Sequence, residues 1–188
     1  MVWLSIGVLF FMAVHLVPSA ARGLRTSLVA RIGENPYKGV FSLLLLAAIA
    51  LIVIGWRSGV PQAVYLPPGW ARPVTLVLMF VSVWLFGAAN VKTRIKRYIR
   101  HPQLTGMALW SFAHLLANGD SRSLILFGGL GLWALIEMLL INRREGGWVK
   151  PDSPALSVEI RTVLISAVAF AVLLYLHRYF AGVAVIAF

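Results

Sequence analysis

The sequence predicts an all-α membrane protein, a polytopic bundle of six transmembrane helices that form a single domain over residues 1–188. Of the 188 residues, 60% are hydrophobic and 12% are charged, and the mean hydropathy is +0.86. The charged residues cluster in short stretches, whereas a soluble domain needs a polar surface on all sides. Between these stretches lie apolar runs close to the length of about 20 residues that crosses a bilayer.

Six apolar segments, bounded by charges, proline or glycine, are the expected membrane helices. They are Val2 to Val17, Tyr37 to Trp56, Pro73 to Asn90, Gln103 to Ala117, Ser123 to Ile141 and Thr162 to Phe180, with an apolar tail to Phe188. The first is followed by Ser-Ala-Ala, as a secretory signal can be, but no Lys or Arg precedes Arg22. Because signal peptides begin with positive charge, we interpret this segment as a helix that is not cleaved.

The distribution of positive charge between the loops predicts the orientation. The chain has 17 Lys and Arg residues against 6 Asp and Glu, a net charge of +11. The loops after the first, third and fifth segments carry 13 of these cations, and those after the second, fourth and sixth carry 4. Since Lys and Arg are retained on the cytoplasmic side, this asymmetry predicts a cell-membrane protein with both termini outside. It also accounts for the basic composition, so we expect no nucleic-acid partner.

Glycine positions indicate where helices pack closely, and the absence of cysteine limits the possible metal ligands. Gly128, Gly129 and Gly131 lie close together in the fifth segment, where they favour close helix packing. A phosphate-binding loop is the weaker interpretation of these glycines, because no strand precedes them. The chain has no cysteine, which excludes disulfides and thiolate metal ligands and leaves His, Asp, Glu or Met to hold any metal.

Ionisable residues inside apolar segments are costly and are therefore the first candidates for function. His15 lies near the inner end of the first segment, and Glu137 is the single carboxylate within a segment. Glu137 lies one to two turns before Asn142, Arg143 and Arg144, so an ion pair with a cytoplasmic arginine is the plain structural interpretation. His177 precedes Arg178 near the outer end of the sixth segment, where it fits a residue of the membrane interface.

The fourth segment is the shortest and has the densest set of unusual residues. Pro102 suits its first turn and Asn118-Gly119 its end, so it is predicted to be a complete short helix. His101 and His114 lie 13 residues apart, about 20 Å along a helix, and cannot share one metal ion. A neutral imidazole beside Trp110 suits haem iron, although composition alone leaves haem as one of several options.

A run of cations precedes this helix. Five of the nine residues from Lys92 to Arg100 are Lys or Arg. We expect Arg97 and Arg100 to hold either anionic lipid head groups or haem propionates at the membrane surface. The alternative is a topology determinant that binds no ligand.

Two sequence strings carry a resemblance to a known family. They are Arg100-His101-Pro102-Gln103-Leu104-Thr105-Gly106 and Phe112-Ala113-His114-Leu115-Leu116-Ala117-Asn118-Gly119-Asp120. With them the chain resembles the NnrU family of bacterial integral membrane proteins over nearly its whole length. The resemblance implies a place in the bacterial inner membrane and a link to denitrification, in nitrite and nitric oxide metabolism.

The same family looks like the plant zeta-carotene isomerase, a membrane protein that uses haem b. Carried over by motif, the haem ligands of that isomerase fall on His15 and His114, with Ser111 in place of a cysteine. The resemblance therefore implies haem b, and redox or isomerase-like chemistry on nitric oxide or a hydrophobic small molecule. If both helices are centred, the two histidines differ in depth by about 14 Å, so His101 is kept as the substitute ligand.

Two other functions remain open. Arg100-His101-Pro102 with Arg143-Arg144-Glu145 is similar to motifs of membrane methyltransferases that use S-adenosylmethionine, on fold analogy alone. This chain departs from them by ending in an apolar helix and by carrying His114. The other alternative is a non-enzymatic factor that supports assembly of a partner membrane protein. In every case the surrounding lipids are expected partners.

Overall fold

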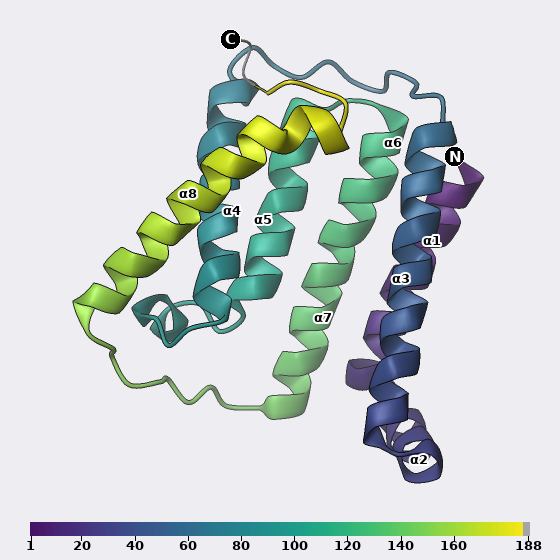
Figure 1. Cartoon of the computed structure of the whole chain (residues 1–188), viewed down its shortest axis with the longest axis vertical. Helices are drawn as coiled ribbons and strands as arrows, with labels where there is room; N and C mark the ends of the chain where they lie inside the picture. Colours follow the sequence, from purple (N-terminus) through teal and green to yellow (C-terminus); the bar gives the residue numbers. More distant parts are fainter. Residues whose placement is uncertain (186–188) are drawn as a thin grey trace.

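The computed structural model describes residues 1–185, and within them every regular element is helical apart from one isolated bridge between Ala63 and Asp120. The predicted all-α class is confirmed (Figure 1). The elements are α1 (Val2–Ala20), α2 (Arg22–Ile32), α3 (Glu34–Ser58), α4 (Ala71–Ala89), the 3-10 turn η1 (Arg94–Arg97), α5 (Pro102–Ala117), α6 (Ser121–Ser123), the π-helical turn η2 (Leu124–Gly128), α7 (Gly129–Glu145) and α8 (Leu156–Phe180). The last three residues of the expected apolar tail lie outside this range.

Five helices of residues 1–185 are long and apolar enough to cross a membrane. They are α1, α3, α4, α8 and the continuous helix Ser121–Glu145 formed by α6, η2 and α7. The expected fourth span, α5, has 16 residues, or about 24 Å of helix, against a hydrocarbon core of about 30 Å. The sequence therefore located every apolar helix, but five rather than six reach a spanning length.

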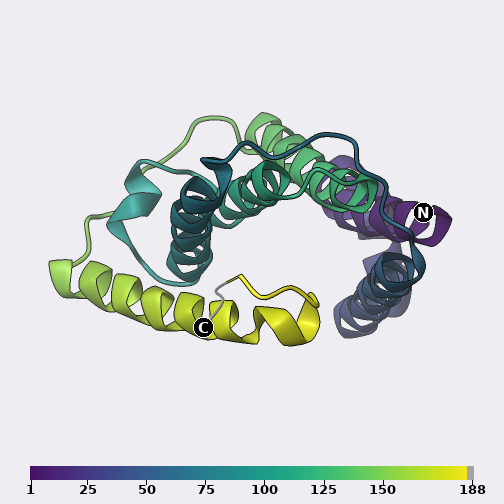
Figure 2. The ribbon, with the colours of Figure 1, turned by 90° about the horizontal axis from the view of Figure 1, so that it is seen from above.

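The helices form an open, curved layer instead of a closed bundle. Successive neighbours in this layer are α3, α1, α7, α5, α4 and α8, and each packs against the next. Seen from above, the layer bends into an arc, and the segment after α8 lies on its concave side (Figure 2). α3 and α8 stand at its two ends, and 11% of the residues in the apolar window of each are buried within the protein.

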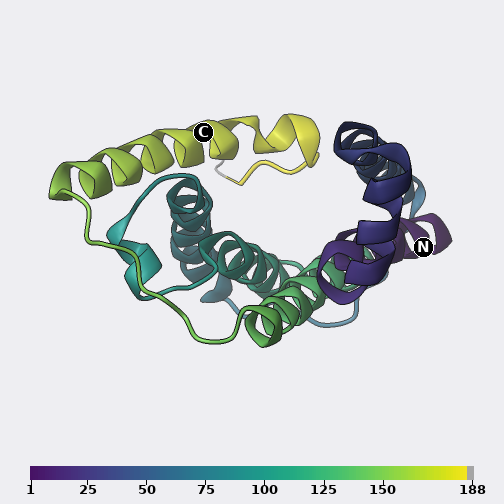
Figure 3. The same cartoon turned by 90° about the horizontal axis from the view of Figure 1, so that it is seen from below.

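The N-terminus and the end of α8 lie at one end of the layer, and α2, η1 and the connection from α7 to α8 lie at the other (Figures 1 and 3). That second end carries the 13 cations whose clustering the sequence revealed, and we call it the cationic end. The segment Arg22–Ile32, expected to be part of a loop, is the helix α2. This helix was not expected because it has no apolar stretch long enough to span a membrane.

Glycines permit close contact between neighbouring helices. A Cβ on Gly55 of α3 would overlap the backbone of Leu4 in α1, and one on Gly7 of α1 would come within 2.7 Å of the Ile52 nitrogen in α3. In α7, a Cβ on Gly129 would overlap the Val8 side chain, whereas Gly128 faces open space. Helix packing, the preferred interpretation of the glycine cluster, is therefore confirmed for Gly129.

Hydrogen bonds from small hydroxyl side chains join α4 to α5. Ser82 Oγ donates to the Gly106 carbonyl at 2.7 Å, and Thr75 Oγ1 donates to the Ala113 carbonyl at 3.1 Å. In an apolar layer such hydroxyls need a partner, because an unpaired buried donor costs free energy. The two bonds hold α5, which is shorter than a full membrane span, against the longer helix α4.

The helix that follows α5 begins with a capped turn. Asp120 accepts hydrogen bonds from the backbone nitrogens of Arg122 and Ser123 and from Ser123 Oγ. Burial works to raise the pKa of Asp120, but these bonds and the nearby Arg122 guanidinium outweigh it and hold the pKa below its usual value. One turn later the helix passes through the π turn η2, which places Phe127 toward α5.

The tight crossing of α1 and α3 gives a testable prediction. Gly55→Ala should lower the melting temperature of the detergent-purified protein, because its Cβ meets the backbone of Leu4 and no side-chain rotation relieves the overlap. Gly39→Ala is the matched control in the same helix, since nothing lies within 4 Å of its added Cβ. The control should be neutral or more stable by about 0.5–1 kcal/mol. Circular dichroism follows the melting of both variants. Equal melting temperatures would contradict the packing described.

Candidate functional site

His114 lies near the C-terminal end of α5, among aromatic rings. Its Nδ1 donates to the Trp110 carbonyl at 2.9 Å, one turn earlier. The imidazole stacks on Phe127 with centroids 4.3 Å apart and lies 4.6 Å from the Trp110 ring. Within the part of the chain described, Nε2 has no hydrogen-bond partner. An imidazole with Nδ1–H held by a carbonyl and Nε2 free is the arrangement that metal-binding histidines use.

His15 in α1 repeats this arrangement on another helix. Its Nδ1 donates to the Phe11 carbonyl at 3.0 Å, and over residues 1–185 its Nε2 is left without a partner. The ring lies 4.1 Å from Phe11, 4.7 Å from Trp133 of α7 and 5.9 Å from Phe41 of α3. Both motif histidines are thus half-buried imidazoles in aromatic surroundings.

The continuous helix Ser121–Glu145 connects the two histidines. His114 contacts Phe127 and His15 contacts Trp133, six residues further along. Six residues correspond to about 9 Å of helical rise between Phe127 and Trp133. They also correspond to a rotation of about 240°, so the two imidazoles approach this helix from different flanks. The structure brings both to one helix without bringing their rings into contact.

His101 has a different environment, at the cationic end of α5. Its Nε2 donates to Asn142 Oδ1 at 2.9 Å, and the residue is the N-cap of α5. His101 is thus bonded to a polar side chain at the end of α7. That bond occupies the ring nitrogen that His15 and His114 keep free.

Of the other expected site residues, one lies with His114 and two do not. Trp110 contacts His114 directly. Arg100 and Arg97 lie at the cationic end, and from Pro102 to His114 the helix rises about 18 Å. Arg100 bonds to Glu145 and to the Gly146 carbonyl. The structure therefore does not place these arginines beside His114.

His177 is a residue whose relation to His114 the sequence did not reveal. It lies near the end of α8, and its Nδ1 donates to the Val183 carbonyl at 2.8 Å. Its imidazole is close enough to that of His114 to act on it electrostatically, although α4 separates α5 from α8 in the layer. The sequence placed both residues toward the outer side, but their approach across the concave side depends on the curvature of the layer.

Glu137 does not form the expected ion pair with a cytoplasmic arginine. Its side chain is buried, with 9% exposed, and Ser19 Oγ of α1 donates to its Oε2 at 2.8 Å. Within residues 1–185 no Lys or Arg pairs with it. The side chain reaches across to α1, whereas Arg144 lies seven residues, or about 10 Å, further along α7 and bonds to Glu145 instead. It also lies near enough to His15 to act on that imidazole electrostatically.

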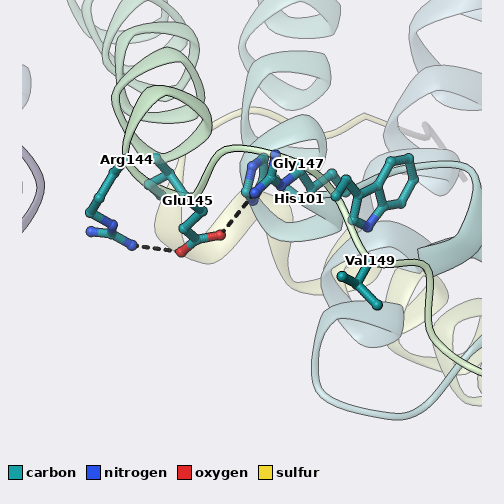
Figure 4. Close-up of a pocket in the computed structure, with 8 residues that line it drawn as sticks. His101, Arg144, Glu145, Gly147 and Val149 are labelled. Carbon is teal, nitrogen blue, oxygen red and sulfur yellow. Dashed lines mark hydrogen bonds and ion pairs between the residues drawn. The ribbon is translucent and has the colours of Figure 1, made fainter.

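A pocket of about 540 Å³ opens at the cationic end (Figure 4). It is lined by residues from the start of α5 and from the end of α7 with the loop beyond, among them Arg100, His101, Ile141, Arg144, Glu145 and Trp148. The sequence did not predict this pocket, because 40 residues separate its two halves. Elsewhere in the described chain no group of three or more His, Asp or Glu residues is arranged to hold a metal ion. A haem iron needs only axial protein ligands.

The buried Ser19–Glu137 pair gives a second prediction. Ser19→Ala should destabilise the protein by about 1–3 kcal/mol, since it removes the hydroxyl donor of a buried carboxyl group. Ser58→Ala is the control, because Ser58 is exposed and bonds only to the carbonyl of Ile54 in its own helix. Thermal melts of both variants in the same detergent measure the difference. A loss as large in Ser58→Ala as in Ser19→Ala would show that the pair has no particular role.

Comparison with known proteins assigns the chain to a family. No curated protein and no solved structure matches it. A family model described as NnrU protein matches residues 3–185, nearly the whole chain. That match covers the two strings around His101 and His114 as well as the first helix with His15. This multi-pass, all-helical membrane protein belongs to the NnrU family.

Proposed function

We propose that the protein binds haem b in the membrane, with His114 as one axial ligand. The observation that carries the proposal is the state of the His114 ring, in which Nδ1 is held by the Trp110 carbonyl and Nε2 is free. Stacking on Phe127 fixes the plane of the imidazole. A ring fixed in this way keeps its free nitrogen aimed in one direction, as a metal ligand requires.

His15 is the proposed opposite ligand. It shares with His114 the carbonyl bond at Nδ1, the free Nε2 and the aromatic neighbours. The contacts of His114 with Phe127 and of His15 with Trp133, both in the continuous helix Ser121–Glu145, support the pairing. His177 is the rival, because it lies in electrostatic range of His114. His101 is the weakest choice, since Asn142 occupies its Nε2.

When bound, such a haem would supply redox chemistry or a site for nitric oxide or a polyene, in keeping with the denitrification link and with the isomerase that the family resembles. The protein's own part is to hold two imidazoles, surround them with Trp110, Phe127 and Trp133, and exclude water. Glu137, bonded to Ser19 and close to His15, places a carboxyl group near this second imidazole.

The methyltransferase alternative has one specific observation in its favour. Arg100-His101 and Arg144-Glu145, the pieces that carry that similarity, line the same pocket. Saturable binding of S-adenosylmethionine, with loss of binding in an Arg144 variant, tests this function. The assembly-factor alternative predicts a purified protein with neither haem nor bound S-adenosylmethionine. For that role α3 and α8 offer exposed apolar faces, since a smaller share of their apolar windows is buried than in the other candidate spans.

The proposed topology has six membrane segments with both termini outside. α5 is included because it is held between α4 and α7, so that its neighbours complete the membrane crossing that its own length does not. Placing the cationic end in the cytoplasm follows the preference for Lys and Arg on that side.

Reporter fusions test the orientation. Alkaline phosphatase joined after Phe188 should be active, since it folds outside the cytoplasm, whereas a fusion within the loop at Gly147 should be inactive. A green fluorescent reporter at the same two sites should show the opposite pattern. Both reporters giving a cytoplasmic signal after Phe188 would reverse the topology while leaving the fold unchanged.

Single replacements of the four histidines by alanine test the haem. Protein purified from haem-supplemented cells should show a Soret band and sharp reduced α and β bands. His114→Ala should lose most of its haem, and His15→Ala should lose haem or change its spectrum, because each removes an axial nitrogen. His101→Ala is the matched control and should retain both haem and spectrum.

Two outcomes would change the proposal. A folded His114→Ala protein with full haem content and an unchanged reduced spectrum would end it. Haem loss in His177→Ala with full retention in His15→Ala would assign the second ligand to α8. Circular dichroism of each variant separates loss of a ligand from loss of the fold.

A further inference from the structure

The pocket at the cationic end is separate from the candidate haem ligands and has a chemistry of its own. Its walls come from the α5 N-terminus, with Arg100 and His101, and from the α7 C-terminus, with Arg144 and Glu145. His114 lies about 18 Å further along α5. The pocket therefore calls for a ligand other than the haem proposed above, and its assignment does not depend on that proposal.

Two arginines of the pocket retain unused hydrogen-bond donors. Arg100 donates to the Gly146 carbonyl at 2.8 Å and to Glu145 Oε2 at 3.2 Å, and Arg144 donates to Glu145 Oε1 at 2.8 Å. Within the described residues these contacts use two of the five N–H donors of Arg100 and one of those of Arg144. Their side chains are 17% and 25% exposed, so both guanidinium groups are partly shielded from water.

Glu145 shows what this pair of arginines can hold. Its carboxylate lies between them, with one oxygen on each guanidinium, and it is 45% exposed (Figure 4). A single carboxylate compensates one of two positive charges, so the cluster keeps a net charge of +1. His101 and its partner Asn142 add no negative charge, because an imidazole and an amide carry none. The arginines thus form a site for a second, larger anion.

The remaining walls place this site at the edge of the membrane. Ile141 lies near the C-terminal end of the apolar helix α7, and half-buried Trp148 lies in the loop that follows this helix. Tryptophan is enriched at the level of lipid head groups. Lys150 lies 5.6 Å from the centre of the Trp148 ring and adds positive charge to the same surface. A ligand in this pocket can keep its anion on the arginines and an apolar part against Ile141.

We propose that this pocket binds a phosphate group, carried by the head group of an anionic membrane lipid, between the guanidinium groups of Arg100 and Arg144. Arginine matches phosphate because its planar fork donates two parallel hydrogen bonds. Glu145 limits this binding, since its carboxylate competes for the same donors. The lipid source is favoured over a soluble phosphate by the apolar wall and by the cationic surface, which attracts anionic lipids.

The experiment titrates the delipidated, detergent-solubilised full-length protein with short-chain phosphatidylglycerol, and retained lipid is counted by native mass spectrometry. Short-chain phosphatidylcholine and inorganic phosphate form parallel arms. Phosphatidylglycerol should saturate at one tight site, and Arg144→Gln should weaken that site about ten-fold. Glu145→Gln should strengthen it, because the competing charge is gone. Arg144→Lys should lie between wild type and Arg144→Gln, since it keeps the charge without the fork.

Arg143→Gln is the matched control, because it removes the same charge at the neighbouring position but does not line the pocket. It should stay within about two-fold of wild type. Equal weakening by Arg143→Gln and Arg144→Gln would overturn the proposal in favour of general surface attraction. Inorganic phosphate that binds as tightly as the lipid, with the same Arg144 dependence, would support the phosphate site but assign it to a soluble ligand. Displacement of phosphatidylglycerol by S-adenosylmethionine would overturn it in favour of the methyltransferase alternative.

Discussion

The structure depends on one constraint, that polar groups inside an apolar layer must find partners within the protein. Backbone groups meet it by forming helices, and side chains meet it through short bonds between helices or back onto their own helix. Ser82 bonds to the carbonyl of Gly106, Ser19 to the carboxyl of Glu137, and both His15 and His114 to a carbonyl one turn earlier. For the histidines this constraint has a chemical result. Nδ1, which is bonded to the backbone carbonyl, cannot bind a ligand, whereas Nε2 remains available.

Much of the fold could be predicted because apolar length and charge clustering are local properties. The six expected segments all appear as helices, and the cations gather at one end as their loop positions indicated. The curvature of the layer was not predictable, because it results from which helices pair, and that depends on contacts such as Gly55 with Leu4. α2 was missed because five of its eleven positions are positive or polar, so its sequence carries no signal for a membrane span.

The candidate site was predictable in its parts but not in its arrangement. His15, His114 and Trp110 were identified from residue type and motif, and they share the aromatic environment expected of them. The expected partner of Glu137 was wrong, since Arg144 lies two turns further along α7 and bonds to Glu145, whereas Ser19 of α1 donates to the Glu137 carboxyl group. Arg100 lies far from His114 because the two residues are at opposite ends of α5. The approach of His177 to His114 and the pocket around Glu145 bring together residues far apart in the chain, and one sequence without tertiary contacts carries no signal for either.

The π turn at Leu124–Gly128 has a consequence for the whole helix that contains it. A π turn accommodates one more residue than an α-helical turn. The sequence positions that face one side of the helix are therefore offset by one residue between the parts before and after the turn. Phe127 belongs to the turn and Trp133 to the regular part after it. If the same residues instead formed a regular α-helical turn, everything beyond it would rotate by about 100°. Trp133 and Glu137 would turn away from α1 together, while the stretch before the turn stayed in place. The orientation of the His15 surroundings relative to those of His114 therefore depends on this turn holding its extra residue.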